Sequence, residues 1–299
     1  MLTSVIDALR SARIEAAFPE TDFAELLLVD RGFGSIVVGV PPQVVIRVPR
    51  TQTVAAAHSR ERRLVPRIAD ELRVAIPRAV WHAAPSTALP WGASAYRWIE
   101  GSQPVVPVSG AAALVADLAD FLAALHRIPL SRVSDVGVPG PSDLARTRAE
   151  DAAVTAPVLR ARLSPREFAT LQTRLGDILS DPILEDFVPA LRHGDLWFGN
   201  VLIDAGSTGL EAVIDWEQAA IGDPAEDLAT QRYLGPAAVA AFTEQYAELV
   251  GGLDAGMLRR ADHHFALREI NGIRRCIEMS DEEELEEELQ SLRNGPLLA

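Results

Sequence analysis

The chain has 299 residues, 48% of them apolar and 23% charged, which is typical of a folded globular protein. This length suits two lobes of unequal size around a cleft better than one small core. The net charge of −14 argues against a nucleic-acid-binding protein, which would carry a basic face. Seven acids lie within 281–288, so the acidity favours a cationic small ligand without identifying one.

The sequence also limits where the protein is expected to act. Its first residues alternate apolar and charged side chains and lack the continuous apolar stretch of a signal peptide. No run approaches the roughly 20 apolar residues of a membrane span. The single cysteine, Cys276, excludes an intramolecular disulfide and is expected in the core. We therefore expect a cytoplasmic protein with no membrane or nucleic-acid partner.

The first hundred residues predict a sheet with one main helix. Short runs rich in β-branched residues alternate with turn signals, which is typical of an antiparallel meander. The expected strands are 24–30, 35–40, 43–48, about 78–84 and 93–100. Helical spacing of apolar residues predicts a helix over about 52–72, in which Pro66 is expected to cause a kink or a restart.

The rest of the chain predicts a mainly helical region. An apolar stripe of helical period covers 110–127. Ser164-Pro165 has the pattern of a cap followed by proline at the first helical position. Further helices are expected from 223 onward, one of them capped by Ser280 before the acidic run. That acidic run could instead attract a cationic substrate.

The strongest functional pattern is RHGDLWFGN (192–200) followed by IDWE (214–217). One Asp, an Asn five residues later and an Asp fifteen residues beyond suit phosphoryl transfer, in which a protein chiefly positions groups and balances charge. Asp195 is expected to orient the attacking hydroxyl. Asn200 and Asp215 are expected to bind Mg²⁺ through hard oxygen ligands, at one end of a short hairpin.

These segments, HGDLWFGN and IDWEQAAIGDPAEDLA, resemble the aminoglycoside phosphotransferase family, small-molecule antibiotic kinases that include macrolide kinases. The resemblance covers nearly the whole chain and is strongest over 191–230. It implies an α+β, bilobal protein-kinase-like fold with ATP or GTP as co-substrate. The antiparallel sheet and main helix of 1–100 would form the nucleotide-binding lobe. Residues 101–299 would form the larger helical lobe, with the catalytic loop and substrate site.

The resemblance implies nucleotide-binding roles in the first lobe. Arg47 stands where the kinase pattern places a phosphate-binding Lys, and arginine can bind phosphate through two donors. Glu61 would pair with Arg47. The loop residues Phe33, Gly34 and Ser35 would offer backbone amides to the β- and γ-phosphates. Tyr96 and Trp98, near the end of the last strand, would belong to the hinge that binds the base.

Other residues of the pattern are expected to support the loop. His193 would brace the loop that carries Asp195. Asp223 and Asp227 would cap the next helix and bind catalytic-loop backbone.

The acceptor stays open between an aminoglycoside-like or other antibiotic and a metabolite such as choline, a ketoamine or a sugar. Asp262, Glu269 and Glu278 are candidate amine-binding acids, whereas Trp197 and Phe198 would suit a bulkier apolar acceptor. A non-catalytic nucleotide-binding pseudokinase is the alternative from another class. The complete set of Asp195, Asn200 and Asp215 argues against it.

Overall fold

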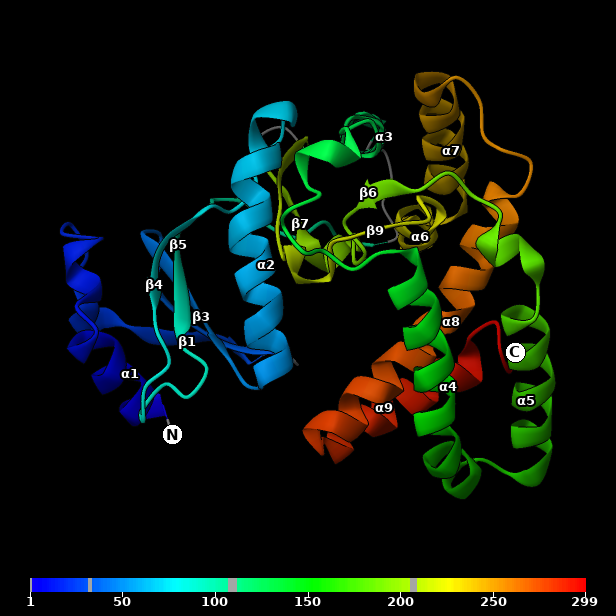
Figure 1. The fold of residues 1–299 in the computed structure, drawn as a ribbon, viewed down its shortest axis with the longest axis horizontal. Coiled ribbons are helices and arrows are strands. Elements are labelled where there is room, and N and C mark those ends of the chain that lie inside the picture. The colour runs from blue at the N-terminus through cyan, green and yellow to red at the C-terminus, as the bar shows by residue number, and fades with distance from the viewer. Residues whose placement is uncertain (1, 32–33, 107–111, 205–208) are drawn as a thin grey trace.

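The N-terminal part of the computed structural model is an antiparallel sheet with a helix on either side; the structure describes residues 2–31, 34–106, 112–204 and 209–299. The sheet has five strands in the order β1-β2-β3-β5-β4. They are β1 (Leu27–Arg31), β2 (Ser35–Val40), β3 (Val44–Pro49), β4 (Ala79–Ala83) and β5 (Ala93–Arg97). Helix α1 (Leu2–Ser11) lies outside the sheet, and α2 (Gln52–Ile68) lies between the sheet and the rest of the molecule (Figure 1).

Two strand ends differ from the sequence expectation. The chain at 24–26 is not strand, because the Asp22 side chain accepts a hydrogen bond from the Ala24 amide and caps a short 3-10 turn over Phe23–Glu25. Strand β5 ends at Arg97 rather than at Glu100. The amide of Trp98 leaves the ladder and donates to the carbonyl of Gln43 at 3.0 Å.

Helix α2 runs through Pro66 to Ile68 as one helix, so the expected restart at Pro66 is wrong. Only two residues follow Pro66 in the helix, so little α-helix remains to be redirected. Thr51 caps the start by accepting from the Val54 amide. The buried face of α2 carries Leu64 and Ile68 into the core of the C-terminal part.

The C-terminal part is mainly helical. Its helices are α3 (Ala112–His126), α4 (Pro141–Arg162), α5 (Pro165–Leu179), α6 (Ala225–Ala229), α7 (Pro236–Val250), α8 (Met257–Met279) and α9 (Glu282–Asn294). Two small antiparallel ladders join β6 (Ala190–Arg192) to β9 (Ala220–Gly222) and β7 (Val201–Ile203) to β8 (Leu210–Val213). The expected hairpin around 200–214 is therefore present.

Helix α4 was not predicted. Its buried residues are Asp151, Thr155 and Leu159, so it lacks a wide apolar stripe, and Pro157 lies inside it. Helix α5 begins as expected, with Ser164 and Glu167 forming a capping box.

The cap of the acidic helix α9 was assigned one residue too early. Asp281 accepts from the Glu284 amide, whereas Ser280 has φ of 53° and ends α8 in the left-handed region.

The sheet and the helical region have separate cores. Val5 and Leu9 of α1 pack on sheet residues such as Val38 and Ile46. The main core joins α2 to α3 and to the small ladders. A third cluster lies among α4, α5, α8 and α9 and includes buried Cys276. Across the described segments, no helix is both long enough and apolar enough to cross a bilayer.

Candidate active site

The loop that carries Asp195 is fixed by a buried carboxylate. Asp227 on α6 accepts hydrogen bonds from the backbone amides of His193 and Gly194, both at 2.8 Å. His126 on α3 lies 3.2 Å from the same carboxylate. The carbonyl of Leu196 accepts from the side chains of Thr230 and Gln231. The loop is therefore held from both sides, and the expected supporting role of Asp227 is confirmed.

Asp223 supports the other end of this region. Its carboxylate accepts from the Ala225 amide at the start of α6, as expected of a cap. The same carboxylate pairs with buried Arg260 at 2.8 Å and lies 2.9 Å from His264, both on α8. Asp223 therefore anchors α8 to the loop before α6 and does not reach the catalytic groups.

Asn200 lies directly beside Asp195. Its amide nitrogen donates to the Asp195 carbonyl at 2.8 Å and lies 3.2 Å from Oδ2 of the same residue. The Asn200 carbonyl accepts from the Ile214 amide at 2.9 Å, next to the β7–β8 ladder. The hairpin thus places Asn200 and Asp215 at the same end, as the spacing predicts.

Asp215 is held in an uncommon backbone conformation. Its φ of 64° lies in the left-handed region, which non-glycine residues adopt rarely. His193 Nε2 lies 3.0 Å from the Ile214 carbonyl, so His193 ties the Asp195 loop to the Asp215 loop, as expected of a bracing residue. Buried Trp216 packs edge-on against His193 and Phe121. These contacts fix the turn in which the Asp215 side chain is presented.

Arg47 on β3 joins the sheet to this turn. Its guanidinium donates to Glu61 at 2.9 Å, to Asp215 at 2.7 Å and to Glu217 at 2.9 Å. The predicted Arg47–Glu61 pair is therefore present, and Glu61 is only 1% exposed. The Tyr96 hydroxyl donates to the other oxygen of Glu61 at 2.8 Å.

The electrostatics of this cluster are unbalanced, because one guanidinium faces three carboxylates. Desolvation raises the pKa of Asp215 despite the charge of Arg47, and Glu217 and Asp195 add to the rise. Burial would lower the pKa of Arg47, but Asp215 and Glu61 hold it well above its usual value. The surplus negative charge is of the kind that a divalent cation would balance.

The donor set fits magnesium. Asp215 and Asn200 offer hard oxygen atoms on adjacent backbone, and Glu217 adds a third such side chain. In the part of the chain that is described, no three or more His, Cys, Asp or Glu side chains form a metal site by themselves. Mg²⁺ binds through one or two carboxylates and takes its remaining ligands from phosphate and water, and Asp215 with Asn200 fits that requirement.

A cavity of about 520 Å³ lies between the sheet and the β7–β8 ladder, and Arg47, Asn200 and Asp215 form its polar end. Val29, Val37 and Val45 line it on the sheet side, and Leu202 and Ile214 line it on the opposite side. The segment from Tyr96 to Gln103 also contributes to the wall. Apolar surfaces on two sides with polar groups at one end are typical of a small-ligand site.

The structure distinguishes the two predicted hinge residues. Both Tyr96 and Trp98 line the cavity. The Tyr96 backbone pairs with Val45 within the sheet, and its hydroxyl donates a hydrogen bond to Glu61. The Trp98 amide is already bonded to Gln43, so the backbone after Trp98 is better placed to meet a ligand.

The predicted phosphate loop is only partly described. Phe33 lies outside the described residues. A Cβ on Gly34 would lie 3.1 Å from Oε1 of Glu217, so the loop passes close to the Arg47 cluster. Ser35 turns its hydroxyl away to His58, 3.1 Å distant, and pairs with Pro49 in the sheet. Neither Gly34 nor Ser35 lines the cavity.

The sequence interpretation missed functional neighbours of both predicted aspartates. Glu217 shares Arg47 with Asp215; a second acid two residues after Asp215 was the signal available. Arg268 on α8 donates to Oδ1 of Asp195 at 3.0 Å. No local pattern marks Arg268, because 73 residues separate it from Asp195.

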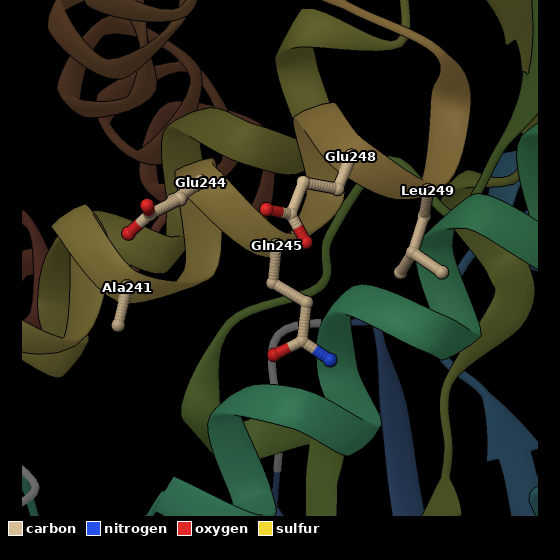
Figure 2. A pocket seen from close by; sticks show the side chains of 5 residues that line it. All are labelled: Ala241, Glu244, Gln245, Glu248 and Leu249. Carbon is tan, nitrogen blue, oxygen red and sulfur yellow. The ribbon is translucent and has the colours of Figure 1, made fainter.

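A second hollow lies on α7, where Ala241, Glu244, Gln245, Glu248 and Leu249 surround about 470 Å³ (Figure 2). None of the catalytic candidates lines it. Its side chains sit along one helix, and we assign it no function.

Comparison with known proteins identifies the family. Residues 34–263 match the phosphotransferase enzyme family, APH. This range is more than half of the chain and includes the Asp195 and Asp215 loops. The chain belongs to the phosphotransferase enzyme family, which confirms the predicted resemblance and the prediction of a phosphotransferase. No curated protein gives a significant match.

Solved structures confirm the predicted protein-kinase-like fold. The GDP and kanamycin complex of APH(2″)-IIIa matches with a TM-score of 0.80 at 22% identity, covering 95% of this chain and 97% of that one. Macrolide 2′-phosphotransferase MphH from Brachybacterium faecium matches with a TM-score of 0.70 at 23% identity, covering 96% and 99%. The streptomycin–ATP–APH(2″)-IIa ternary complex matches with a TM-score of 0.69 at 20% identity, covering 97% of both chains.

Proposed function

We propose that this phosphotransferase is a magnesium-dependent small-molecule kinase that transfers the γ-phosphate of ATP or GTP to a hydroxyl group. The observation that carries the proposal is the placement of Asn200 and Asp215 at the polar end of the cavity, with Asp195 hydrogen-bonded to Asn200. Family membership and neighbours described as GDP or ATP complexes support it. The proposed site of action is the cytoplasm, where these nucleotides are plentiful.

In this proposal each of the two lobes has its own role. Residues 1–100 bind the nucleotide, with its base between the sheet valines and Leu202 and its phosphates toward Arg47. Glu61 orients Arg47 through their hydrogen bond. Residues 101–299 supply the catalytic loop and the acceptor site.

Asp195 acts as the proton acceptor for the attacking hydroxyl. Burial would raise its pKa, but Arg268 and Arg275 hold it below the usual value, so the carboxylate is ionised at neutral pH. Asn200 fixes the orientation of that carboxylate. Magnesium held by Asn200 and Asp215 would neutralise charge on the phosphates.

The family relatives suggest an antibiotic as acceptor, because two of the neighbours are named for kanamycin or streptomycin and one as a macrolide phosphotransferase. A hydroxylated metabolite is the second candidate. The acids considered for amine binding do not favour an aminoglycoside. Asp262 pairs with Arg232, Glu278 pairs with Arg274, and Glu269 is buried.

The decisive experiment compares the parent chain with Asp195→Asn. We expect the parent chain to hydrolyse ATP or GTP slowly in the presence of Mg²⁺, and to phosphorylate at least one member of a panel of aminoglycosides, macrolides and amino alcohols. General-base catalysis is worth about 10²–10⁴-fold, so Asp195→Asn should lose transfer by that factor while nucleotide affinity stays within about threefold. Nucleotide binding with no magnesium-dependent turnover in the parent chain would instead support a pseudokinase.

A further inference from the structure

An arginine side chain from α8 contacts the carboxylate of Asp195, the proposed base. Arg268 bonds Oδ1 of Asp195, and Arg275 lies two turns further along α8. Residues seven apart in a helix lie on the same face, so both guanidinium groups belong to one side of α8. The side chain that α8 places against the proposed base is therefore a cation, 3.0 Å from its carboxylate.

One aromatic ring, Tyr233, lies against Arg268, and three more rings pack around Tyr233. Tyr233 packs edge-on against Trp197, Phe198 and Phe265, with centroid distances of 6.5, 6.0 and 5.4 Å. The Arg268 guanidinium lies over the Tyr233 ring, 5.6 Å from its centroid. All four rings keep part of their surface accessible, and none lines the cavity beneath the sheet. We call Trp197, Phe198, Tyr233, Phe265 and Arg268 the acceptor wall.

This wall offers little to a polyamine. Asp262 is already paired with Arg232, which itself lies over the Phe265 ring. The Glu288 carboxyl of α9 lies against Gly272, which stands between Arg268 and Arg275 along α8. The positive charges of both arginines act on this carboxyl. Burial and Glu284 raise the pKa of Glu288, so its negative charge is disfavoured. Asp262 and Glu288 are therefore poor partners for an amine, and Asp195 is committed to the hydroxyl.

Arg268 has binding capacity to spare. A guanidinium has five N–H donors, and Asp195 and Tyr233 together use only part of them. The side chain is 27% exposed, so a ligand can reach it. Oδ2 of Asp195 is engaged by Asn200 and Oδ1 by Arg268. An acceptor hydroxyl that binds Oδ1 would compete with Arg268, and an anionic group on the same acceptor would give Arg268 a new partner.

We propose that the acceptor is an alcohol with an aromatic or apolar body and an anionic group, which Arg268 binds while the body packs on the acceptor wall. This inference rests on the proposed kinase function and narrows its substrate class away from polyamines. The arrangement combines stacked arginine with aromatic rings, which suits planar carboxylates and apolar surfaces together.

The test uses three probes of one shape: 3-phenyllactate, its neutral amide, and phenylalaninol, which carries an amine. Binding of each, and of kanamycin, is measured by calorimetry with and without Mg²⁺ and a non-hydrolysable ATP analogue. We expect phenyllactate to bind at least tenfold more tightly than its amide and than phenylalaninol. Arg268→Gln should reduce this preference to less than threefold, and Arg268→Lys should restore part of it. Arg259→Gln, on the exposed face of α8, is the matched control and should leave the preference unchanged.

The proposal is overturned if the parent chain shows no preference for the acid, whether all three probes bind equally or none binds. Tighter binding of kanamycin or phenylalaninol would also overturn it. If Arg268→Gln slows nucleotide hydrolysis without acceptor and leaves probe selectivity intact, Arg268 serves the transferred phosphate instead. Magnesium-dependent nucleotide hydrolysis by the parent chain is recorded separately, so a failed kinase proposal is recognised by the absence of that turnover, whichever probe binds.

Discussion

Arg47 and Asp215 are separated by 168 residues in the sequence, yet Nη2 of Arg47 lies 2.7 Å from Oδ1 of Asp215. The contact joins a strand of the sheet to the turn that follows the β7–β8 ladder. Glu61 and Glu217 bind the same guanidinium. A phosphate entering the site would have to share Arg47 with these carboxylates. Nucleotide affinity is therefore expected to depend on the arrangement of the Arg47 ion pairs.

Arg47→Ala should raise the nucleotide KM by about 10–100-fold, because a charge-assisted bond to phosphate is worth roughly 1.5–3 kcal/mol. It should also destabilise the fold by about 3–5 kcal/mol, because Glu61 would remain buried without its cation. Arg47→Lys keeps the charge and should lose less of both. Steady-state kinetics and urea unfolding measure the two effects. Arg78→Ala, which removes an exposed ion pair with Asp70, is the control; equal losses in both alanine variants would contradict the assignment.

Asn200→Ala and Asp215→Ala should each raise the Mg²⁺ concentration for half-maximal activity by at least about tenfold, because each removes one of the two proposed oxygen ligands. Glu217→Gln should have a smaller effect in the same direction. Magnesium titrations of nucleotide hydrolysis measure the change. Asp177→Asn, an exposed carboxylate on α5, should behave as the parent chain. Unaltered magnesium dependence in both alanine variants would remove the metal assignment.

Asp227→Asn should destabilise the protein by about 1–3 kcal/mol, because an amide nitrogen would then face backbone donors and leave one unsatisfied. Burial would raise the pKa of Asp227, but His126 and other neighbours hold it below 3.8. The carboxylate therefore contributes stability above that pH and loses the contribution as the pH falls. Unfolding of both proteins at pH 7 and pH 3.5 tests this: the gap between them should narrow at the lower pH.

Glu269→Gln should stabilise the protein at pH 8. Burial raises the pKa of Glu269 from 4.5 to about 7, and its Oε2 atom is buried with no hydrogen-bond partner within the described structure. Because the pKa of this carboxyl is higher in the folded state, the free energy of unfolding falls as the pH rises from about 4.5 through about 7. Above that pH it does not fall further on account of Glu269. At about 1.4 kcal/mol per pKa unit, the gain from the amide is at most about 3.5 kcal/mol.

Unfolding free energies of the parent and Glu269→Gln chains should converge near pH 4 and separate by pH 8. Glu278→Gln is the surface control, since Glu278 is about half exposed and paired within its own helix. If the unfolding free energy of the parent chain did not change between pH 5 and pH 8, the raised pKa of Glu269 would be contradicted.

Local sequence chemistry determined much of the fold. β-branched runs separated by turn residues gave the strands of the sheet to within a few residues, because side-chain alternation is a local property. Ser164-Pro165 marked the start of α5 for the same reason. Local rules erred where competing signals were close: at Asp22, whose cap shortened β1, and at Asp281, which replaced Ser280 as the cap of α9.

The chemistry of the proposed centre was also visible in the sequence, since Asp195, Asn200 and Asp215 lie within 21 residues and one hairpin joins them. Of the acceptor wall, Trp197 and Phe198 were considered from the sequence, whereas Arg268, Tyr233 and Phe265 were not. Arg268 reaches Asp195 only because α8 packs beside the catalytic loop, and Tyr233 meets Phe265 from another element. Spacing along the chain fixes which groups a loop can present, whereas contacts between distant elements depend on packing. The sequence by itself therefore determined the family and the phosphate chemistry, and the tertiary structure alone decided which side chain of α8 meets Asp195.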